Sequence, residues 1–281
     1  MIEDVEVTLV SVETGDGVRL HGALAGRPGG PAVLGVHGAW GNFYATPVFE
    51  LVRQAAERGA LALTLNGRGH DLGGADDGAP SIGLMRERLE LAPLDLEAAR
   101  QALEARGGSR YVVVAHSYGC TRATYWLART RPPGCVGLVL LTPPPPLWET
   151  SALFVDGDLE DHFSAARRAV AEGDPDRLVL LRPGGRMPVI AEAATVMSIW
   201  APESSSRVLP HLPHLDVPTL VVVGGREPDA YLREAELALG AARDAELVVL
   251  EGENHYYRRD RAALGAAVYD WIERRQLFAA G

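Results

Sequence analysis

The sequence is poor in cysteine. Only two cysteines, Cys120 and Cys135, occur among its 281 residues. Two cysteines cannot form the disulfide framework of a small secreted domain, and they show no metal-ligand spacing. Such scarcity is typical of proteins from reducing compartments. We therefore expect a protein with no metal site and no cofactor, in which Cys120 belongs to the packing of a helix.

The sequence also lacks a basic cluster and a long apolar run. Its formal net charge is −10, which argues against nucleic acid or an anionic membrane surface as a partner. No apolar run approaches the length of a membrane span, and residues 1–6 are acidic where a signal peptide is basic. These absences favour a cytoplasmic protein whose partner is a small molecule.

Short apolar runs alternate with segments of helical spacing along most of the chain. Runs typical of buried strands occupy 32–36, 60–65, 136–141, 219–223 and 246–250, and another begins at Tyr111. Residues 5–13 and 17–26 alternate apolar and polar side chains around Gly15-Asp16-Gly17, which is typical of a hairpin at a sheet edge. This order predicts an α/β fold with a mostly parallel sheet of about eight strands flanked by helices.

Capping residues predict where several helices begin. Thr46 followed by Pro47 is typical of an N-cap and a first helical position. By the same rule, we expect Asp95 to cap the next long helix and Asp229 to cap a helix near the C-terminal end of the chain.

The alternation of strands and helices stops at four consecutive prolines, Pro143 to Pro146, because such a run continues neither a helix nor a central strand. It resumes near Pro218. The residues in between have helical spacing in pieces and contain no strand-turn-helix unit. We therefore expect a core made of residues 1–146 and 216–281, interrupted by a helical insertion over residues 147–215.

Ser117 lies between the apolar run that begins at Tyr111 and a segment with helical spacing. In such a strand-turn-helix unit the serine occupies a strained turn with its Oγ above the sheet edge, and small residues two positions away on either side allow the bend. Here those residues are Ala115 and Gly119. The usual pattern is G-x-S-x-G, so Ala115 replaces the first glycine. This turn makes Ser117 a candidate nucleophile.

A serine nucleophile needs a base and a third group that orients the base. His255 follows the last predicted strand in a polar turn, at the same sheet edge as Ser117 if the strands are parallel. The loop after the preceding strand offers two carboxylates, Glu227 and Asp229. We favour Glu227 as the orienting acid, because Asp229 is placed to cap a helix.

The other seven histidines are weaker candidates for the base. Three of them stand in turns close to glycines, where we expect structural hydrogen bonds: His37, His70 and His116. The remaining four lie in the early hairpin or in and beside the insertion: His21, His162, His211 and His214. Pro213 keeps the last two from sharing one helical face, so we expect no metal pair there.

The order Ser117, Glu227, His255, with the serine in a sharp turn, resembles the α/β-hydrolase superfamily, whose chain order is nucleophile, acid, histidine. The resemblance covers nearly the whole chain. His37-Gly38 is similar to that family's oxyanion turn, and Arg68-Gly69-His70 is similar to a turn that many members carry after the next strand. The departures are Ala115, where glycine is usual, and Glu227, where aspartate is usual.

The resemblance implies a serine hydrolase that cleaves a small-molecule ester or related acyl bond through an acyl-enzyme. It also implies that the backbone N–H groups of Ala39 and Tyr118 bind the oxyanion. In this family an insertion at 147–215 is commonly a helical cap over the pocket. The side chains expected to line an apolar pocket come from the turns and the cap: Trp40, Tyr44, Tyr118, Trp148, Phe154, Met197 and Trp200.

Two alternatives stay open at this point. The same triad could cleave thioester, amide, lactone or carbon–carbon bonds, or transfer the acyl group to another acceptor, because fold and triad do not fix the substrate. The fold could also serve as a non-catalytic binding module, although such proteins tend to lose a triad member. The sequence leaves the acyl length and the oligomeric state open, with a homodimer as one option.

Overall fold

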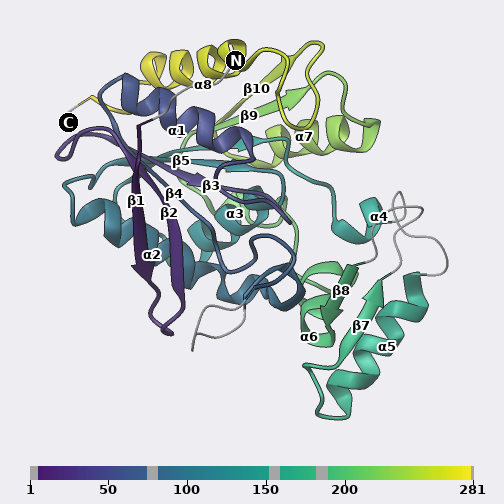
Figure 1. The fold of residues 1–281 in the computed structure, drawn as a ribbon. Helices are drawn as coiled ribbons and strands as arrows, with labels where there is room; N and C mark the ends of the chain where they lie inside the picture. Colours follow the sequence, from purple (N-terminus) through teal and green to yellow (C-terminus); the bar gives the residue numbers. More distant parts are fainter. Residues whose placement is uncertain (1–5, 75–81, 152–158, 182–188, 280–281) are drawn as a thin grey trace.

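The computed structural model describes residues 6–74, 82–151, 159–181 and 189–279. Its centre is an eight-stranded sheet with the strand order β1-β2-β4-β3-β5-β6-β9-β10 (Figure 1). The strands are β1 Thr8–Glu13, β2 Arg19–Ala25, β3 Ala32–Val36, β4 Leu61–Leu65, β5 Tyr111–His116, β6 Cys135–Leu141, β9 Thr219–Gly224 and β10 Ala245–Leu250. Strand β2 is antiparallel to β1 and β4, whereas the other neighbours pair in parallel. The predicted fold class is therefore confirmed.

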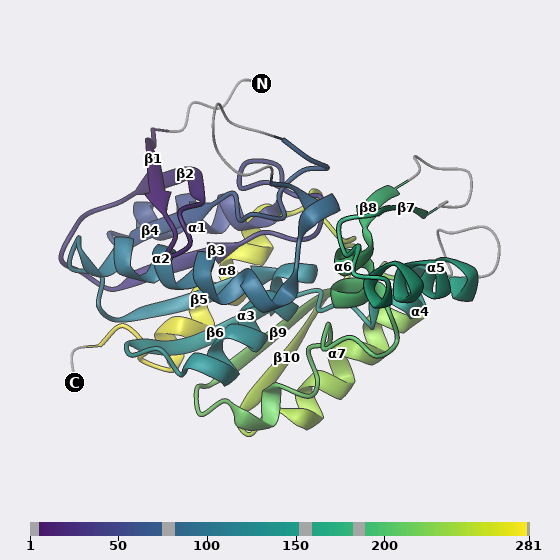
Figure 2. The same ribbon diagram turned by 90° about the horizontal axis from the view of Figure 1, so that it is seen from below.

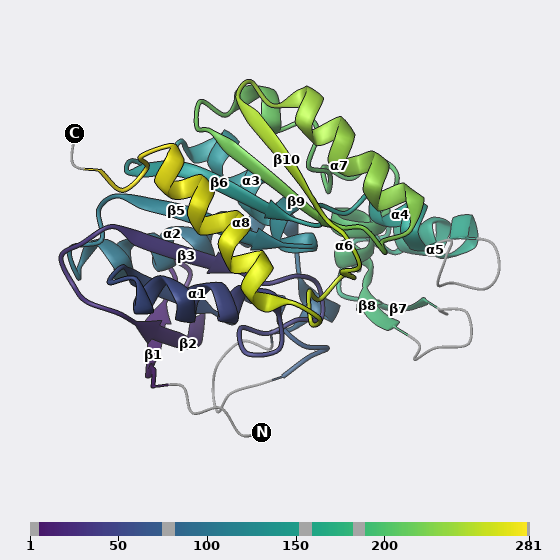
Figure 3. The same cartoon turned by 90° about the horizontal axis from the view of Figure 1, so that it is seen from above.

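Helices cover both faces of this sheet (Figure 3). On one face lie α1 Pro47–Glu57 and α8 Arg261–Arg274, and on the other lie α2 Ala92–Glu104, α3 Tyr118–Thr130 and α7 Asp229–Ala241. Every residue of β3, β4 and β5 is buried, as expected for parallel strands covered on both sides. An apolar core lies on each face of the sheet, between the strands and the helices. The central parallel strands end at one edge of the sheet, and the turns that carry the candidate site begin there.

The predicted N-cap of α1 is confirmed in position, whereas the predicted caps Asp95 and Asp229 are wrong. Thr46 is the N-cap of α1, but its hydroxyl donates to the carbonyl of Asn42 instead of capping. Helix α2 begins at Ala92, so Asp95 lies in its first turn, where its carboxylate accepts hydrogen bonds from Arg68. Asp229 is the first residue of α7 and makes no capping hydrogen bond. Thr46 and Asp95 thus have a local and a tertiary partner that spacing along the chain does not reveal.

Residues 147–215 form a group of short elements at one end of the sheet (Figure 2). They comprise α4 Leu147–Ser151, α5 Leu159–Ala171, β7 Leu178–Leu181, β8 Val189–Glu192, α6 Ala193–Thr195, the π-helical turn η3 Val196–Trp200 and the 3₁₀ turn η4 Leu212–His214. The apolar side chains of α5, β7, β8, α6 and η3 form a cluster that also includes Ala39 and Tyr118, whereas Leu212 and Leu215 belong to the core under the sheet. The segment therefore packs directly on the turns that follow β3 and β5.

The insertion is helical in pieces, as expected, but it also contains two strands that the sequence analysis does not predict, because β7 and β8 pair as a two-stranded antiparallel sheet. Val179 and Leu181 are buried, whereas Leu178 and Leu180 are exposed, which is the two-residue alternation of a half-buried strand. The run Leu-Val-Leu-Leu is apolar at every position, so its sequence hides this alternation.

Candidate active site

Ser117 occupies the sharp turn between β5 and α3. Its backbone has φ 53° and ψ −127°, a conformation that non-glycine residues rarely adopt and that is found mainly at functional sites. The N–H of Ser117 donates to the carbonyl of Leu141 at 2.9 Å, which ties the turn to the end of β6. The structure thus holds Ser117 in a strained, half-buried turn at the carboxyl edge of the sheet.

Close backbone approaches explain the small residues around this turn. A Cβ atom at Gly119 would lie 2.5 Å from the carbonyl oxygen of Val36 and 2.6 Å from that of His37. A Cβ atom at Gly38 would lie 2.9 Å from the Cβ of Ser117. Glycine is therefore required where the turn after β3 touches the serine turn, whereas Ala115 is fully buried within β5 and fits without a glycine.

The N–H groups of Ala39 and Tyr118 face no acceptor among the residues that the structure describes. Tyr118 is the first residue of α3, so its N–H is one of the donors that a helix leaves unpaired at its N-terminus. The predicted oxyanion donors thus lie in the two adjoining turns, and both are free to donate to a ligand.

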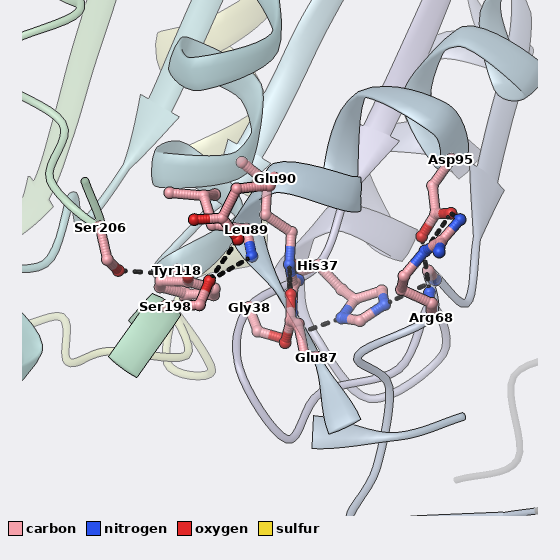
Figure 4. Close-up of polar contacts among 12 residues, drawn as sticks. His37, Gly38, Arg68, Glu87, Leu89, Glu90, Asp95, Tyr118, Ser198 and Ser206 are labelled. Atoms are coloured by element: carbon pink, nitrogen blue, oxygen red, sulfur yellow. Dashed lines mark hydrogen bonds and ion pairs between the residues drawn. The ribbon is translucent and has the colours of Figure 1, made fainter. Parts of the chain in front are cut away.

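His37 holds the first of these turns. Its Nε2 accepts a hydrogen bond from the N–H of Gly67 at 3.0 Å, so its Nδ1 carries the proton and donates to the carbonyl of Gly38 at 2.8 Å (Figure 4). Burial, helped by the nearby charge of Arg122, lowers the pKa of His37 to about 3. A neutral His37 therefore fixes the peptide between Gly38 and Ala39, and with it the direction of the Ala39 N–H.

A buried ion pair lies behind the same turn. The guanidinium of Arg122, on α3, makes two hydrogen bonds to the carboxylate of Glu87, one of them 2.7 Å long. It also donates to the carbonyl of His37 at 2.7 Å. Both side chains are almost fully buried, with 6% and 2% of their surfaces exposed. Arg122 thus joins the helix that starts after Ser117 to the turn that carries Ala39.

A second ion pair holds the turn after β4. Arg68 donates to Asp95 through its backbone N–H at 2.7 Å and its Nε at 2.8 Å (Figure 4). It also contacts Asp16 at 2.9 Å, and this hydrogen bond lowers the pKa of Asp16 to about 2. Next to it, the ring of His70 contacts Asp71 at 2.8 Å. The Arg-Gly-His turn is therefore structural here.

His255 and Glu227 meet at the other side of Ser117. The Nδ1 of His255 lies 3.2 Å from the Oε1 of Glu227. The Glu227 side chain is 3% exposed, and that of His255 is 26% exposed. In the described part of the chain, Ser117 Oγ makes no hydrogen bond to the His255 ring, and Asp229 makes none to His255. The remaining ring nitrogen of His255 is thus not engaged by Ser117 in this structure.

Three hydrogen-bonding groups hold the loop that carries His255. The Nε2 of His116 bonds to the carbonyl oxygen of His255 at 2.7 Å. The hydroxyl of Tyr257 donates to the carbonyl of Val222 at 2.9 Å, and the carboxylate of Glu253 accepts from two backbone N–H groups further along the loop. Burial drives the pKa of His116 well below its ordinary value, and the neighbouring His255 adds to this effect. His116 is therefore a neutral donor to this loop.

The predicted pocket side chains fall into two groups. Trp148, Met197 and Trp200 belong to the apolar cluster of residues 147–215. Trp40 is 48% exposed, with its ring centroid 6.4 Å from that of Trp200, and Tyr44 is 61% exposed. Phe154 lies outside the described residues. Trp40 therefore links the turn after β3 to the insertion, whereas Tyr44 lies on the open surface.

Sequence reasoning missed Arg122 and Glu87. The sequence offers one signal, a charged residue in the first turns of the helix after Ser117, four positions from Tyr118, and it does not identify the partner. In the described ranges, no group of three His, Cys, Asp or Glu side chains could hold a metal ion. Within those same ranges, no helix is long and apolar enough to cross a membrane.

The fold and the turns around Ser117 define a class, and comparison with known proteins identifies it. Residues 33–267 match a family model described as the alpha/beta hydrolase family. The chain belongs to this family. Comparison with curated proteins gives no match.

Several solved structures share the fold. Est1E from Butyrivibrio proteoclasticus, solved with ferulic acid bound, has a TM-score of 0.72 at 16% identity, covering 95% of this chain and 99% of its own. The esterase domain of a Rhodothermus marinus protein has a TM-score of 0.63 at 16% identity, with 96% and 99% covered. The Pyrococcus furiosus esterase Pf2001 has a TM-score of 0.65 at 17% identity, with 96% and 91% covered. At such identities the likeness establishes the fold alone.

Proposed function

We propose that this protein is a serine hydrolase that cleaves a small-molecule carboxylic ester through an acyl-enzyme. The observation that carries the proposal is the convergence of three parts at one sheet edge: Ser117 in its strained turn, the His255–Glu227 contact, and the free N–H groups beside Ser117. Family membership and the esterases among the similar folds support it.

In the proposed reaction, Ser117 Oγ attacks the ester carbonyl while His255 Nε2 takes its proton. Glu227 keeps the proton of His255 on Nδ1 and stabilises the imidazolium that forms. The oxyanion accepts hydrogen bonds from Ala39 and Tyr118, and each such donor is typically worth roughly 3 kcal/mol. Collapse of the intermediate expels the alcohol, which takes the proton from His255, and water then releases the acid by the same steps in reverse order.

We further propose that residues 147–215 act as a cap on a core made of residues 1–146 and 216–281. Its apolar cluster includes Ala39 and Tyr118, so it borders both proposed oxyanion donors. A cap in this position excludes water and shapes the acyl pocket. The low cysteine content supports a cytoplasmic location, and the net charge of −10 supports a small molecule as the partner.

Hydrolysis of p-nitrophenyl esters with acyl chains of two to twelve carbons tests this proposal. We expect turnover by the wild type, with a preferred chain length, and none above background for Ser117→Ala. Thioesters and anilides of the preferred acyl group run in parallel identify the bond. Equal turnover by the wild type and Ser117→Ala would exclude the serine mechanism.

A further inference from the structure

A cavity lies where α7 meets the insertion, and Ser117 is not among its lining residues. Its volume is about 330 Å³. It is bounded by the proline turn after β6, by α4, by residues 207–210 and by α7, with lining residues that include Pro145, Glu149, Arg207, Arg233, Glu234 and Leu237. None of the proposed catalytic residues lines it, so the proposed reaction gives this cavity no role.

The most buried of the charged residues that line this cavity is Glu234. The residue is only 5% exposed, and in the described part of the chain its carboxyl makes no hydrogen bond. A buried carboxylate without a hydrogen-bond donor is strongly unfavourable. Burial raises the pKa of Glu234 to about 7, Glu149 raises it further, and Arg207 opposes the rise. The carboxyl of Glu234 therefore opens onto the cavity without a protein donor, and a ligand in the cavity can donate to it.

The charged groups around the cavity indicate the chemistry of that ligand. Glu149 on α4 adds a second carboxylate, and Arg233 on α7 is exposed to solvent. The guanidinium of Arg207 stacks over the ring of Trp148, 4.2 Å from its centroid. Stacking leaves Arg207 charged, but among the described residues no side chain hydrogen bonds to Glu234, so the acceptor that is free inside the cavity is the carboxyl of Glu234. An anion in this cavity would lie beside two carboxyl groups, whereas an ammonium group would pair with them.

We propose that this cavity is a binding site for a small ligand with a primary ammonium group, which donates its hydrogen bonds to Glu234. A cation beside Glu234 favours its ionised form, so binding is coupled to proton release. Near neutral pH a fraction of a proton should leave per ligand bound, because burial raises the pKa of Glu234 and keeps part of it protonated. The site is independent of the proposed ester chemistry.

Isothermal titration calorimetry with the full-length protein tests this, with propylamine, β-alanine and propionate as probes. The two amines should bind and propionate should not. Repeating the propylamine titration in buffers of different ionisation enthalpy should give the proton release. The apparent affinity should fall about tenfold from pH 8 to pH 6, because the ionised fraction of Glu234 falls by that factor. Binding of propionate in preference to propylamine, with proton uptake, would overturn the proposal.

Two variants assign the effect to Glu234. Glu234→Gln should weaken propylamine binding at least tenfold and abolish the proton release. Glu236→Gln removes an exposed carboxylate from the same helix and should change neither. Thermal unfolding of both variants checks that they fold. The proton release measured with the wild type tests the proposal even if a variant does not fold. Unchanged propylamine binding by a folded Glu234→Gln, or no binding by the wild type at millimolar concentrations, would contradict the site.

Discussion

The two sides of Ser117 are built from different interactions. On the oxyanion side, a buried ion pair between Arg122 and Glu87 supports the turn that carries Ala39, and His37 is locked between two backbone groups. On the base side, His255 is partly exposed, and its loop is held by hydrogen bonds from His116 and from residues around Tyr257.

This difference corresponds to what each side does in the proposed reaction. Oxyanion donors stabilise charge best when they are fixed before the reaction, because they then need no reorganisation. A base must reach first the serine and then the leaving group. The fold therefore supports the donors with a buried ion pair and a locked histidine. On the base side, hydrogen bonds hold the loop of His255, including those that the buried carboxylate of Glu253 accepts.

The largest effect should come from the acid on the base side. Glu227→Gln keeps the shape but lets the ring of His255 take the wrong tautomer, so kcat should fall by about 10³ to 10⁴. Asp229→Asn is the matched control, because Asp229 makes no hydrogen bond to His255. It should lose only a favourable charge at the start of α7, about 0.3 to 1 kcal/mol of stability. Steady-state kinetics showing the opposite ranking would assign the acid role to Asp229.

The next effect concerns Arg122. Arg122→Met leaves Glu87 buried and unpaired, which should cost about 3 to 5 kcal/mol of stability. Arg122→Met/Glu87→Met should recover most of that stability, because both charges are gone. Its kcat should still fall by up to about 10² with KM little changed, because the Ala39 N–H is no longer held in place. Wild-type kcat in the folded double variant would show that the pair contributes to stability alone.

A smaller effect should follow from His116→Phe, which removes the hydrogen bond to the carbonyl of His255. A neutral hydrogen bond contributes about 0.5 to 1.5 kcal/mol, so kcat should fall by at most about tenfold. The comparison between the two sides predicts that this loss is smaller than the loss in the Arg122→Met/Glu87→Met variant. The reverse order in kcat, measured on one ester, would show that the base side is the more tightly constrained.

The smallest effect on the chemistry should come from residues 147–215. Trp200→Ala and Met197→Ala should change KM and the preferred acyl length while leaving the reactivity of Ser117 nearly intact. Values of kcat/KM across the ester series measure the preferred acyl length, and the rate of labelling by a fluorophosphonate measures the reactivity of Ser117. An unchanged preference together with lost labelling would place this segment in the catalytic core instead of a cap.

The sequence is sufficient to predict the sheet, because strands such as β3 and β5 are continuous apolar runs with glycine-containing turns at their ends. It also points to Ser117 and His255, whose positions after strands are local features. It does not reveal the supports behind them. Glu87 and Arg122 are 35 residues apart, and only the folded chain brings them together. For the same reason the spacing predicts Asp95 as a helix cap, whereas its carboxylate accepts hydrogen bonds from Arg68.

The most direct test of the central claim is the reaction of the protein with a fluorophosphonate, followed by peptide mass spectrometry. The account predicts one covalent adduct, on Ser117, in the wild type. It predicts no adduct in Ser117→Ala, and slower labelling in Arg122→Met/Glu87→Met and Glu227→Gln. Labelling at full rate in Ser117→Ala, or an adduct on another serine of the wild type, would contradict Ser117 as the nucleophile.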